Sequence, residues 1–262
     1  MAELLPANRP FSIRSIRIPP ALRILVLGPH PDDFDAIGVT MRFFHNNGGS
    51  IHVTVIRTGG GVEDSYCSPP TLEAKAALRD AEQRRSCRFF GLANESLTLL
   101  DMEQDEKAHP RPTPANLNRV RDIILRCSPD FVFLPHGNDT NIGHRMVYAM
   151  FRQVVGEECL PVAAFLNRDP KTIDMRIDGY MEFEEDEARW KGQLLRMHAT
   201  QHQRNLNTRN HGFDERILDL NRNTARKLGI TQAYAEAFEV EFHGRETEEP
   251  RGQGRLSGFP RE

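Results

Sequence analysis

Short apolar runs alternate with amphipathic helix patterns along most of this 262-residue chain. The first run, Arg23–Gly28, reads RILVLG and is followed by a proline, which is typical of a strand buried on both faces of a parallel sheet. Residues 36–46 then predict a helix, and residues 51–58 alternate in polarity as a second strand does. This alternation predicts an α/β fold with a Rossmann-like, doubly wound, mainly parallel sheet that carries helices on both faces.

The alternation continues almost to the C-terminus. Further helices are predicted over 71–90, 113–128, 144–155, 185–197 and 215–228, and further strands over 96–100, 131–136, 162–166 and 237–242. We therefore expect one α/β domain over residues 21–242. An N-terminal extension, residues 1–20, precedes it, and a polar C-terminal tail, residues 243–262, follows it.

Composition and charge exclude several classes of protein. The formal net charge is -3 and the signs are mixed along the chain, so there is no basic stripe of the kind that nucleic acid requires. No apolar run reaches the roughly 20 residues of a transmembrane helix, and the first twenty residues lack the apolar core of a secretory signal. The four cysteines form no Cys-x-x-Cys pair. We expect a cytoplasmic protein with no nucleic acid partner and no membrane span.

Histidine and aspartate side chains follow the first predicted strand directly. In open α/β sheets the ligand crevice lies beyond the carboxyl ends of the strands, and this place reads GPHPDDFD. His30 and Asp33 can converge on one cation across the tight turn, while Asp32 stays free to act on a bound water. The plainer alternative is that an aspartate caps the following helix, although capping does not account for the histidine.

A third ligand has to come from another strand end, because a catalytic zinc typically has three protein ligands and one open position. The loop after residues 131–136 offers His136, Asp139 and His144. Asp139 could orient a ligand histidine, as carboxylates often do at zinc sites, or it could start a turn. The loop is therefore a candidate second half of a metal site.

These motifs resemble those of the LmbE/PIG-L-like de-N-acetylases, zinc-dependent deacetylases that act on N-acetylglucosaminyl (GlcNAc) compounds and related amides. PHPDD, residues 29–33, resembles the first motif of that family. By that resemblance His30 and Asp33 are metal ligands and Asp32 is the catalytic base. Weaker similarity extends over roughly Arg23 to Val240, which implies that the whole domain is LmbE-like.

The second motif of the family is only partly present. His144 takes the place of the ligand histidine, but Asn141 stands where the family commonly has another histidine, and Gly143 where it has an aspartate. Asparagine can donate a hydrogen bond but no proton at accessible pH. The chain therefore predicts a slower enzyme or a substitute proton donor, for which the candidates are His198, His202 and His211.

The resemblance also suggests contacts with the substrate. Arg79, in the predicted helix 71–90, and Asp101, at the end of the next predicted strand, are implied as contacts for substrate hydroxyls. The Thr58–Gly61 loop ends another predicted strand and could line the same pocket. Asp139, Asn141 and His198 are the other residues expected to touch substrate or to support the ligands.

The function implied is that of a metal-dependent amide hydrolase, which removes an acetyl (acyl) group from an N-acetylated amino sugar or similar amide. Metal-activated water would attack, with Asp32 as general base and then acid. The implied cofactor is Zn2+, although the same His2Asp set suits other divalent metals. The expected partners are a small N-acetylated substrate and, as an open alternative, a second copy of the chain in a homo-oligomer.

Two rival functions fit parts of the pattern. A nucleotide-dependent oxidoreductase would need glycines in the first turn, which here holds prolines and acids that would repel a pyrophosphate. The other rival is a divergent family member that binds metal or ligand without efficient catalysis, and Asn141 motivates it. The intact His30, Asp32 and Asp33 favour an active hydrolase.

Overall fold

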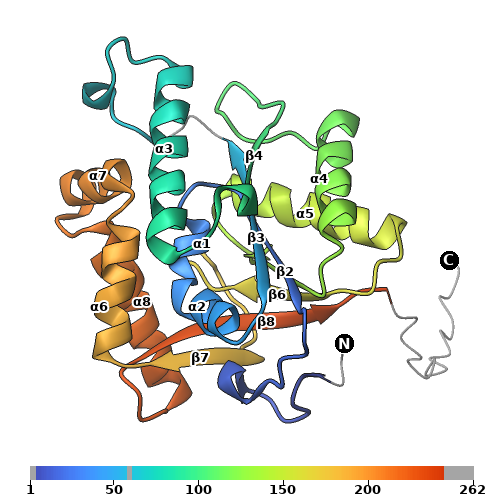
Figure 1. Ribbon diagram of the computed structural model, residues 1–262. Coiled ribbons are helices and arrows are strands. Elements are labelled where there is room, and N and C mark those ends of the chain that lie inside the picture. The colour runs from blue at the N-terminus through green and yellow to red at the C-terminus, as the bar shows by residue number, and fades with distance from the viewer. Residues whose placement is uncertain (1–3, 58–60, 245–262) are drawn as a thin grey trace, which may run out of the picture.

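The computed structural model describes residues 4–57 and 61–244 (Figure 1). The described chain forms an eight-stranded sheet in the order β1-β7-β8-β6-β5-β2-β3-β4. The strands are β1 (Phe11–Ser12), β2 (Arg23–Gly28), β3 (Ser50–Arg57), β4 (Leu97–Asp101), β5 (Phe131–Pro135), β6 (Ala163–Asn167), β7 (Gly179–Phe183) and β8 (Tyr234–Phe242). Strands β4, β3, β2, β5 and β6 pair in parallel, whereas β8 is antiparallel to β6 and β7. The predicted α/β fold with a mainly parallel sheet is confirmed.

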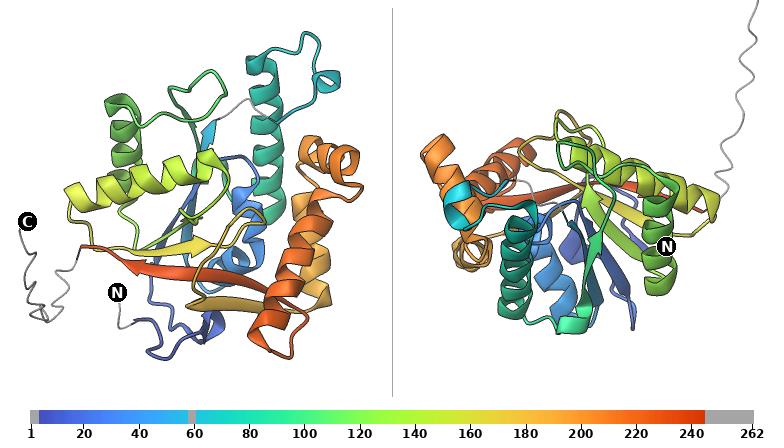
Figure 2. Two further views of the ribbon diagram at one scale, coloured as in Figure 1. Left: turned by 180° about the vertical axis from the view of Figure 1, so that it is seen from behind. Right: turned by 90° about the horizontal axis from the view of Figure 1, so that it is seen from above.

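Helices cover both faces of this sheet (Figure 2). They are α1 (Asp33–Ala36), α2 (Gly38–Asn46), α3 (Leu72–Phe90), α4 (Pro114–Cys127), α5 (Ile142–Glu157), α6 (Glu185–Leu195), α7 (Ala199–Arg209) and α8 (Phe213–Leu228). Successive strand side chains point to opposite faces, so β2 contributes to two core layers. Ile24 and Val26 pack in the layer that holds α2, and Leu25 and Leu27 in the layer that holds α4 and α5.

Several helix boundaries follow from the local sequence. The Thr71 side chain accepts a hydrogen bond from the Ala74 amide at the start of α3, and Thr113 caps α4 in the same way. Helix α3 ends at Gly91, whose φ of 104° is a left-handed conformation that favours glycine. These predicted starts and stops are confirmed.

Strands β1 and β7 and helices α1 and α7 are absent from the prediction. Strand β1 lies in the N-terminal extension and pairs with β7, and it is too short to show a periodicity. Helix α7 buries Thr200, Gln201 and Asn205, which are all polar, so hydrophobic periodicity could not detect it. The predicted C-terminal tail lies outside the described residues from position 245 onward.

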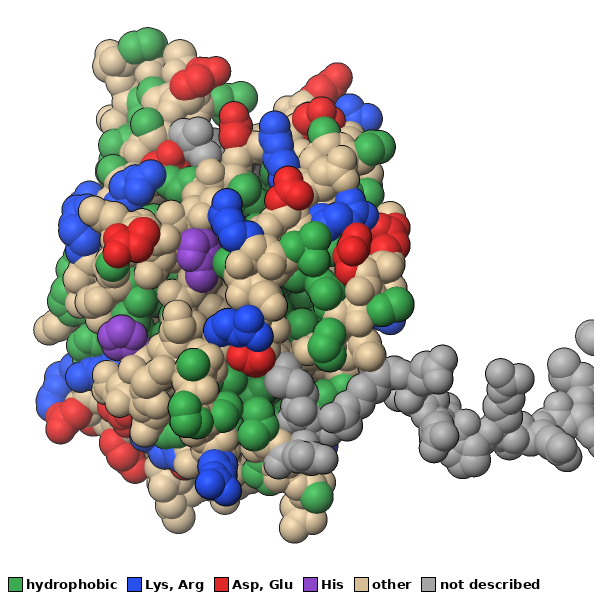
Figure 3. Space-filling model, turned by 45° about the vertical axis from the view of Figure 1, so that its right-hand side comes forward, with side chains coloured by type: hydrophobic (Ala, Val, Ile, Leu, Met, Phe, Trp, Pro, Cys, Tyr) green, Lys and Arg blue, Asp and Glu red, His purple; other side chains and the backbone are tan. Residues whose placement is uncertain are grey.

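The described surface has two further features. No described helix is both long and apolar enough to cross a membrane. On the face seen in Figure 3, basic and acidic side chains are interspersed rather than gathered by sign.

The order of the strands determines where a ligand can bind. From β2 the chain runs outward to β3 and β4, and it then returns through α4 to β5 on the other side of β2. The connections therefore leave β2 and β5 in opposite directions. This reversal opens a crevice beyond the carboxyl ends of the two strands, which is where ligands bind in open α/β sheets.

A buried ion pair connects α6 to β8. The ammonium of Lys191 lies 2.7 Å from Glu236 Oε1 and 2.7 Å from Asn221 Oδ1, and both charged side chains are at most 2% exposed. Glu236 also accepts hydrogen bonds from the amides of Val39 and Thr40, at the start of α2. One carboxylate thus holds α2, α6 and β8 together.

Replacing Glu236 by glutamine is expected to lower the free energy of unfolding by about 3–5 kcal/mol, because it leaves the buried Lys191 without a counter-charge. Urea unfolding followed by circular dichroism measures the change. Glu187→Gln is the matched control: Glu187 pairs with Arg14 at the surface, where loss of a pair changes stability by at most about 1 kcal/mol. Equal losses in the two variants would contradict the expectation.

Candidate active site

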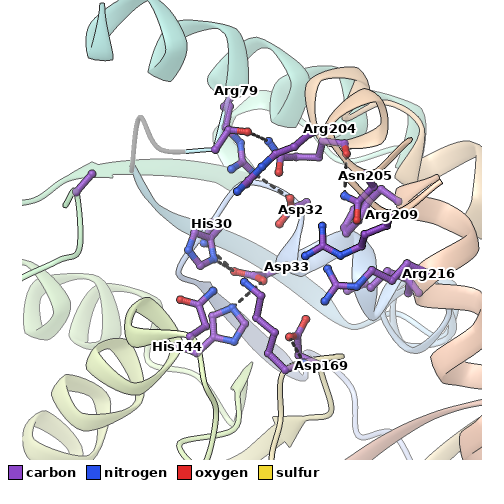
Figure 4. Close-up of a pocket in the computed structure, with 18 of the residues that line it drawn as sticks. His30, Asp32, Asp33, Arg79, His144, Asp169, Arg204, Asn205, Arg209 and Arg216 are labelled. Carbon is purple, nitrogen blue, oxygen red and sulfur yellow. Dashed lines mark hydrogen bonds and ion pairs between the residues drawn. The ribbon is translucent and has the colours of Figure 1, made fainter. Parts of the chain in front are cut away.

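A cavity of about 230 Å³ opens at the carboxyl ends of β2 and β5 (Figure 4). The loops after β2, β5 and β6 surround it, together with α7 and α8. The described residues that line it are His30, Asp32, Asp33, Ala36, Gly61, Arg79, Lys107, Ala108, His109, Asn141, His144, Asp169, Lys171, Gln201, Arg204, Asn205, Arg209, Phe213, Arg216 and Ile217. The cavity therefore occupies the crevice that the strand order predicts.

The turn after β2 presents two carboxylates in different environments. Asp33 Oδ2 accepts a 2.7 Å hydrogen bond from the backbone amide of His30 and lies 3.4 Å from Nδ1 of the same histidine. Asp32 occupies the N-cap position of α1, but its side chain makes no capping hydrogen bond. Its φ of 117° is a left-handed conformation that is strained for a residue other than glycine. Helix capping therefore does not account for the Asp32 side chain.

Three of the predicted residues form a cluster that could hold a metal ion. The ligand atoms of His30, Asp33 and His144 all lie within 4.8 Å of one another. His144 Nε2 is 3.7 Å from Asp33 Oδ1, and the two imidazole centroids are 5.2 Å apart. Two imidazoles and one carboxylate are a donor set that suits zinc and several other divalent metals. The residues present therefore fit the implied metal.

Asp139 holds His144 in place from behind. It is fully buried, and its Oδ2 lies 3.0 Å from His144 Nδ1, which leaves Nε2 facing Asp33. Burial alone would lower the pKa of His144, but the hydrogen bond to Asp139 and the charge of Asp33 raise it to about 9. Burial would raise the pKa of Asp33, but the hydrogen bond and charge of His30 lower it to about 2. A metal ion that binds here therefore displaces a proton from His144.

Asp32 is held by two side chains of α3. Its Oδ2 accepts a 2.7 Å hydrogen bond from Arg79, and its backbone amide donates to Gln83 Oε1 at 3.1 Å. Burial and the neighbouring Asp33 raise the pKa of Asp32, and Arg79 offsets only part of that effect. A carboxylate with a raised pKa beside a candidate metal site is suited to accept and return a proton.

A buried network supports Asp32 from the side away from the cavity. Gln83 donates to Asp35 at 3.2 Å, and His198 Nε2 lies 2.7 Å from the same Asp35 oxygen. Asp35 and His198 are fully buried. His198 therefore contacts the site through Asp35 and Gln83, and it is not among the described lining residues, nor are His202 and His211.

Asn141 and Gly143, the two residues that depart from the second motif, lie side by side. Asn141 caps α5, where its Oδ1 accepts a 2.9 Å hydrogen bond from the Gly143 amide. A Cβ added at Gly143 would lie 3.2 Å from His30 Nε2, which is a tight contact. The absence of a side chain at position 143 thus leaves room for the His30 ring in this arrangement.

The remaining predicted residues divide between the cavity and its surroundings. Gly61 lines the cavity, whereas residues 58–60 of that loop lie outside the described residues. Asp101 is exposed at the end of β4 and is not among the described lining residues, and His136 pairs instead with Glu239 at 3.3 Å.

Sequence reasoning missed several lining residues, among them Asp169, Arg204, Asn205, Arg209 and Arg216. Asp169 follows β6, a third strand end at the same edge of the sheet, which is a signal that could have found it. Gln201, Arg204 and Asn205 share one face of α7 at i, i+3 and i+4 spacing. Without the neighbouring elements, that polar face is indistinguishable from a solvated one.

The cavity has an excess of positive charge. Among the described residues that line it, six are Lys or Arg and three are Asp. The whole chain has a formal net charge of -3, so the excess is local to this site. Figure 4 shows Arg204, Arg209 and Arg216 on the wall opposite His30 and His144.

Comparison with known protein families identifies the family of this chain. The family described as GlcNAc-PI de-N-acetylase (PIG-L) matches residues 25–155, a stretch that contains both strand-end motifs. The chain belongs to this family. No curated protein sequence gives a significant match.

Solved structures share the PIG-L fold at low sequence identity. N,N'-diacetylchitobiose deacetylase from Pyrococcus horikoshii has a TM-score of 0.69 and 18% identity, over 84% of each chain. The 4-carboxy-2-hydroxymuconate hydratase GalB from Pseudomonas putida has a TM-score of 0.64 and 19% identity, over 90% of this chain and all of GalB. The A40926 pseudoaglycone deacetylase Dbv21 has a TM-score of 0.62 and 18% identity, over 86% of this chain and 99% of Dbv21. At these identities the likeness shows a common fold.

Proposed function

We propose that this PIG-L family chain is a metal-dependent hydrolase that removes an acetyl group from an N-acetylated amino sugar or similar amide. The observation that carries the proposal is the convergence of His30, Asp33 and His144 beside the separately held carboxylate of Asp32. Membership of a family of de-N-acetylases supports it. Two of the solved relatives are named as deacetylases, which agrees with it.

The metal would be held by His30, Asp33 and His144, with Asp139 fixing the orientation of His144. When bound, a divalent metal supplies a nucleophilic water at neutral pH and polarises the amide carbonyl. Zinc is the metal we propose first, because two histidines and one carboxylate are a common catalytic zinc set.

Asp32 would act as general base and then as general acid in this reaction. As the attacking water forms its bond to the acyl carbon, Asp32 accepts one of its protons, and it then gives that proton to the amine nitrogen as the C–N bond breaks. The products are acetate and the free amine. Arg79 keeps the carboxylate aimed into the cavity through its 2.7 Å contact.

Acetate release from a panel of N-acetylated amino sugars, measured on zinc-loaded and on chelator-treated protein, tests the proposal. We expect acetate from at least one sugar, loss of turnover on chelation, and recovery when zinc is returned. Retention of zinc with no acetate from any sugar would contradict the hydrolase. That result would favour the alternative of a family member that binds metal or ligand without efficient catalysis.

A second candidate function is the addition of water to a carbon–carbon double bond of a carboxylate. Two observations favour it: the cationic cavity wall and the likeness to a structure named as a carboxymuconate hydratase. Loss of ultraviolet absorbance from a conjugated unsaturated carboxylate, without release of acetate from amides, would identify it.

We also propose that the catalytic unit extends beyond the matched residues 25–155 to the predicted bounds 21–242. The reason is that α7 and α8 supply part of the cavity wall. The N-terminal extension would then dock on this unit through β1.

A further inference from the structure

Three arginines of α7 and α8 gather on one wall of the cavity, opposite the proposed metal ligands. Arg204 and Arg209 come from α7 and Arg216 from α8, and Figure 4 shows their guanidinium groups directed toward the space beside Asp32 and Asp33. The wall formed by these three residues is here called the arginine wall.

No ion pair joins the arginine wall to a carboxylate among the described residues, although Asp169 lies near enough to Arg216 to affect its pKa. The Arg209 guanidinium donates instead to the Thr208 hydroxyl at 2.9 Å. Several other arginines of this chain differ in this respect: Arg14, Arg121 and Arg222 each pair with a carboxylate. The wall therefore keeps donors available for a ligand.

The arginines also crowd one another. A Cβ added at Gly61 would lie 2.7 Å from Arg204 Nη1 and 3.6 Å from Arg79 Nη1, so these two guanidinium groups share a small space. Burial lowers the pKa of Arg216, and the nearby charges of Arg209 and Arg204 lower it further, against the opposing effect of Asp169 and Asp32. An anion placed between the arginines would relieve this repulsion.

A second observation points to a ligand in the same place. Asn205 is 5% exposed and lies between the arginines along α7, and its Oδ1 is buried without a hydrogen-bond partner among the described residues. Buried polar atoms are nearly always hydrogen-bonded in folded proteins. A substrate hydroxyl or amide would supply the missing donor.

From this arrangement we infer that the substrate carries an anionic group, a carboxylate or a phosphate, which binds the arginine wall while the acyl group lies at His30, Asp33 and His144. Guanidinium groups bind these two anions through paired, charge-assisted hydrogen bonds. The inference rests on the proposed function for the position of the reacting amide. An anion site on the arginine wall would favour binding of acidic N-acetylated amino sugars over neutral ones.

Binding to the zinc-loaded Asp32→Asn variant tests the inference without turnover. Isothermal titration compares N-acetylglucosamine with its 6-phosphate and with N-acetylmuramic acid, which carries a carboxylate. We expect at least one anionic sugar to bind about tenfold or more tightly than the neutral sugar, and the preference to shrink as salt is raised. Equal affinities for all three sugars would overturn the arginine wall as an anion site.

Single arginine replacements added to Asp32→Asn show which residue binds the anionic group. They are Arg204→Gln, Arg209→Gln and Arg216→Gln. At least one is expected to remove most of the preference, whereas Arg226→Gln, an exposed position of α8 outside the cavity lining, leaves it unchanged. A preference that survives all three replacements would come from another cation at the cavity, such as Lys107, Lys171 or the metal, and would overturn the inference. Anion binding without acetate release by the wild type would overturn the hydrolase and leave the anion site standing.

Discussion

The Asp32→Asn protein is expected to bind zinc as the wild type does and to release acetate at least about 10²–10⁴-fold more slowly, the usual contribution of general acid–base catalysis. Asparagine has nearly the same shape as aspartate and tolerates the left-handed conformation at position 32, whose φ is 117°. It cannot accept a proton from the attacking water. The substitution therefore removes the proton transfer and leaves the turn intact.

The measurement is acetate release under saturating substrate, together with the zinc content of each preparation. Asp219→Asn is the matched control, because Asp219 is exposed on α8, pairs with Arg222 and is not among the described lining residues. Its activity should equal that of the wild type. An Asp32→Asn enzyme that keeps more than a tenth of the wild-type rate would show that another group acts as the base.

The second large effect is expected at His144. Replacing it by alanine removes one of the three proposed ligands, so zinc binding and acetate release should both fall below detection at micromolar zinc. Asp139→Asn keeps all three proposed ligands and changes only the partner of His144 Nδ1. A loss of such support typically weakens metal affinity by about 10–100-fold.

Zinc affinities measured by competition with a chromogenic chelator should therefore follow the order wild type, Asp139→Asn, His144→Ala. Excess zinc should restore most of the activity of Asp139→Asn but none of the activity of His144→Ala. If His144→Ala binds zinc as tightly as Asp139→Asn does, His144 is not a ligand and the assignment of the second strand end is wrong.

The sequence was sufficient for the first half of the site because that half is local. His30, Asp32 and Asp33 lie within four residues of each other, directly after a strand that its own apolar run predicts. The placement of His144 near them also followed from the sequence, because parallel strands bring their carboxyl ends to one edge of a sheet. The fold class was predictable for the same reason.

The opposite wall was not predictable, because it depends on contacts between distant segments. Arg204 and Arg216 lie more than 170 residues after the first motif. Helix α7 carries polar side chains on its buried face as well as on its exposed face. A charge on such a helix normally indicates solvent exposure. Only the packing of α7 and α8 beside the turn after β2 directs these arginines into the cavity.

The backbone conformation at Asp32 has a consequence for how this chain can change. Glycine adopts a left-handed φ without a steric penalty, so it would suit the backbone there better than any acidic residue does. Loss of the carboxylate would, however, take from the buried Arg79 the acidic group that lies 2.7 Å from it. The chain thus keeps a strained backbone at the residue proposed to perform the chemistry, and the ion pair with Arg79 offsets part of the cost of that strain.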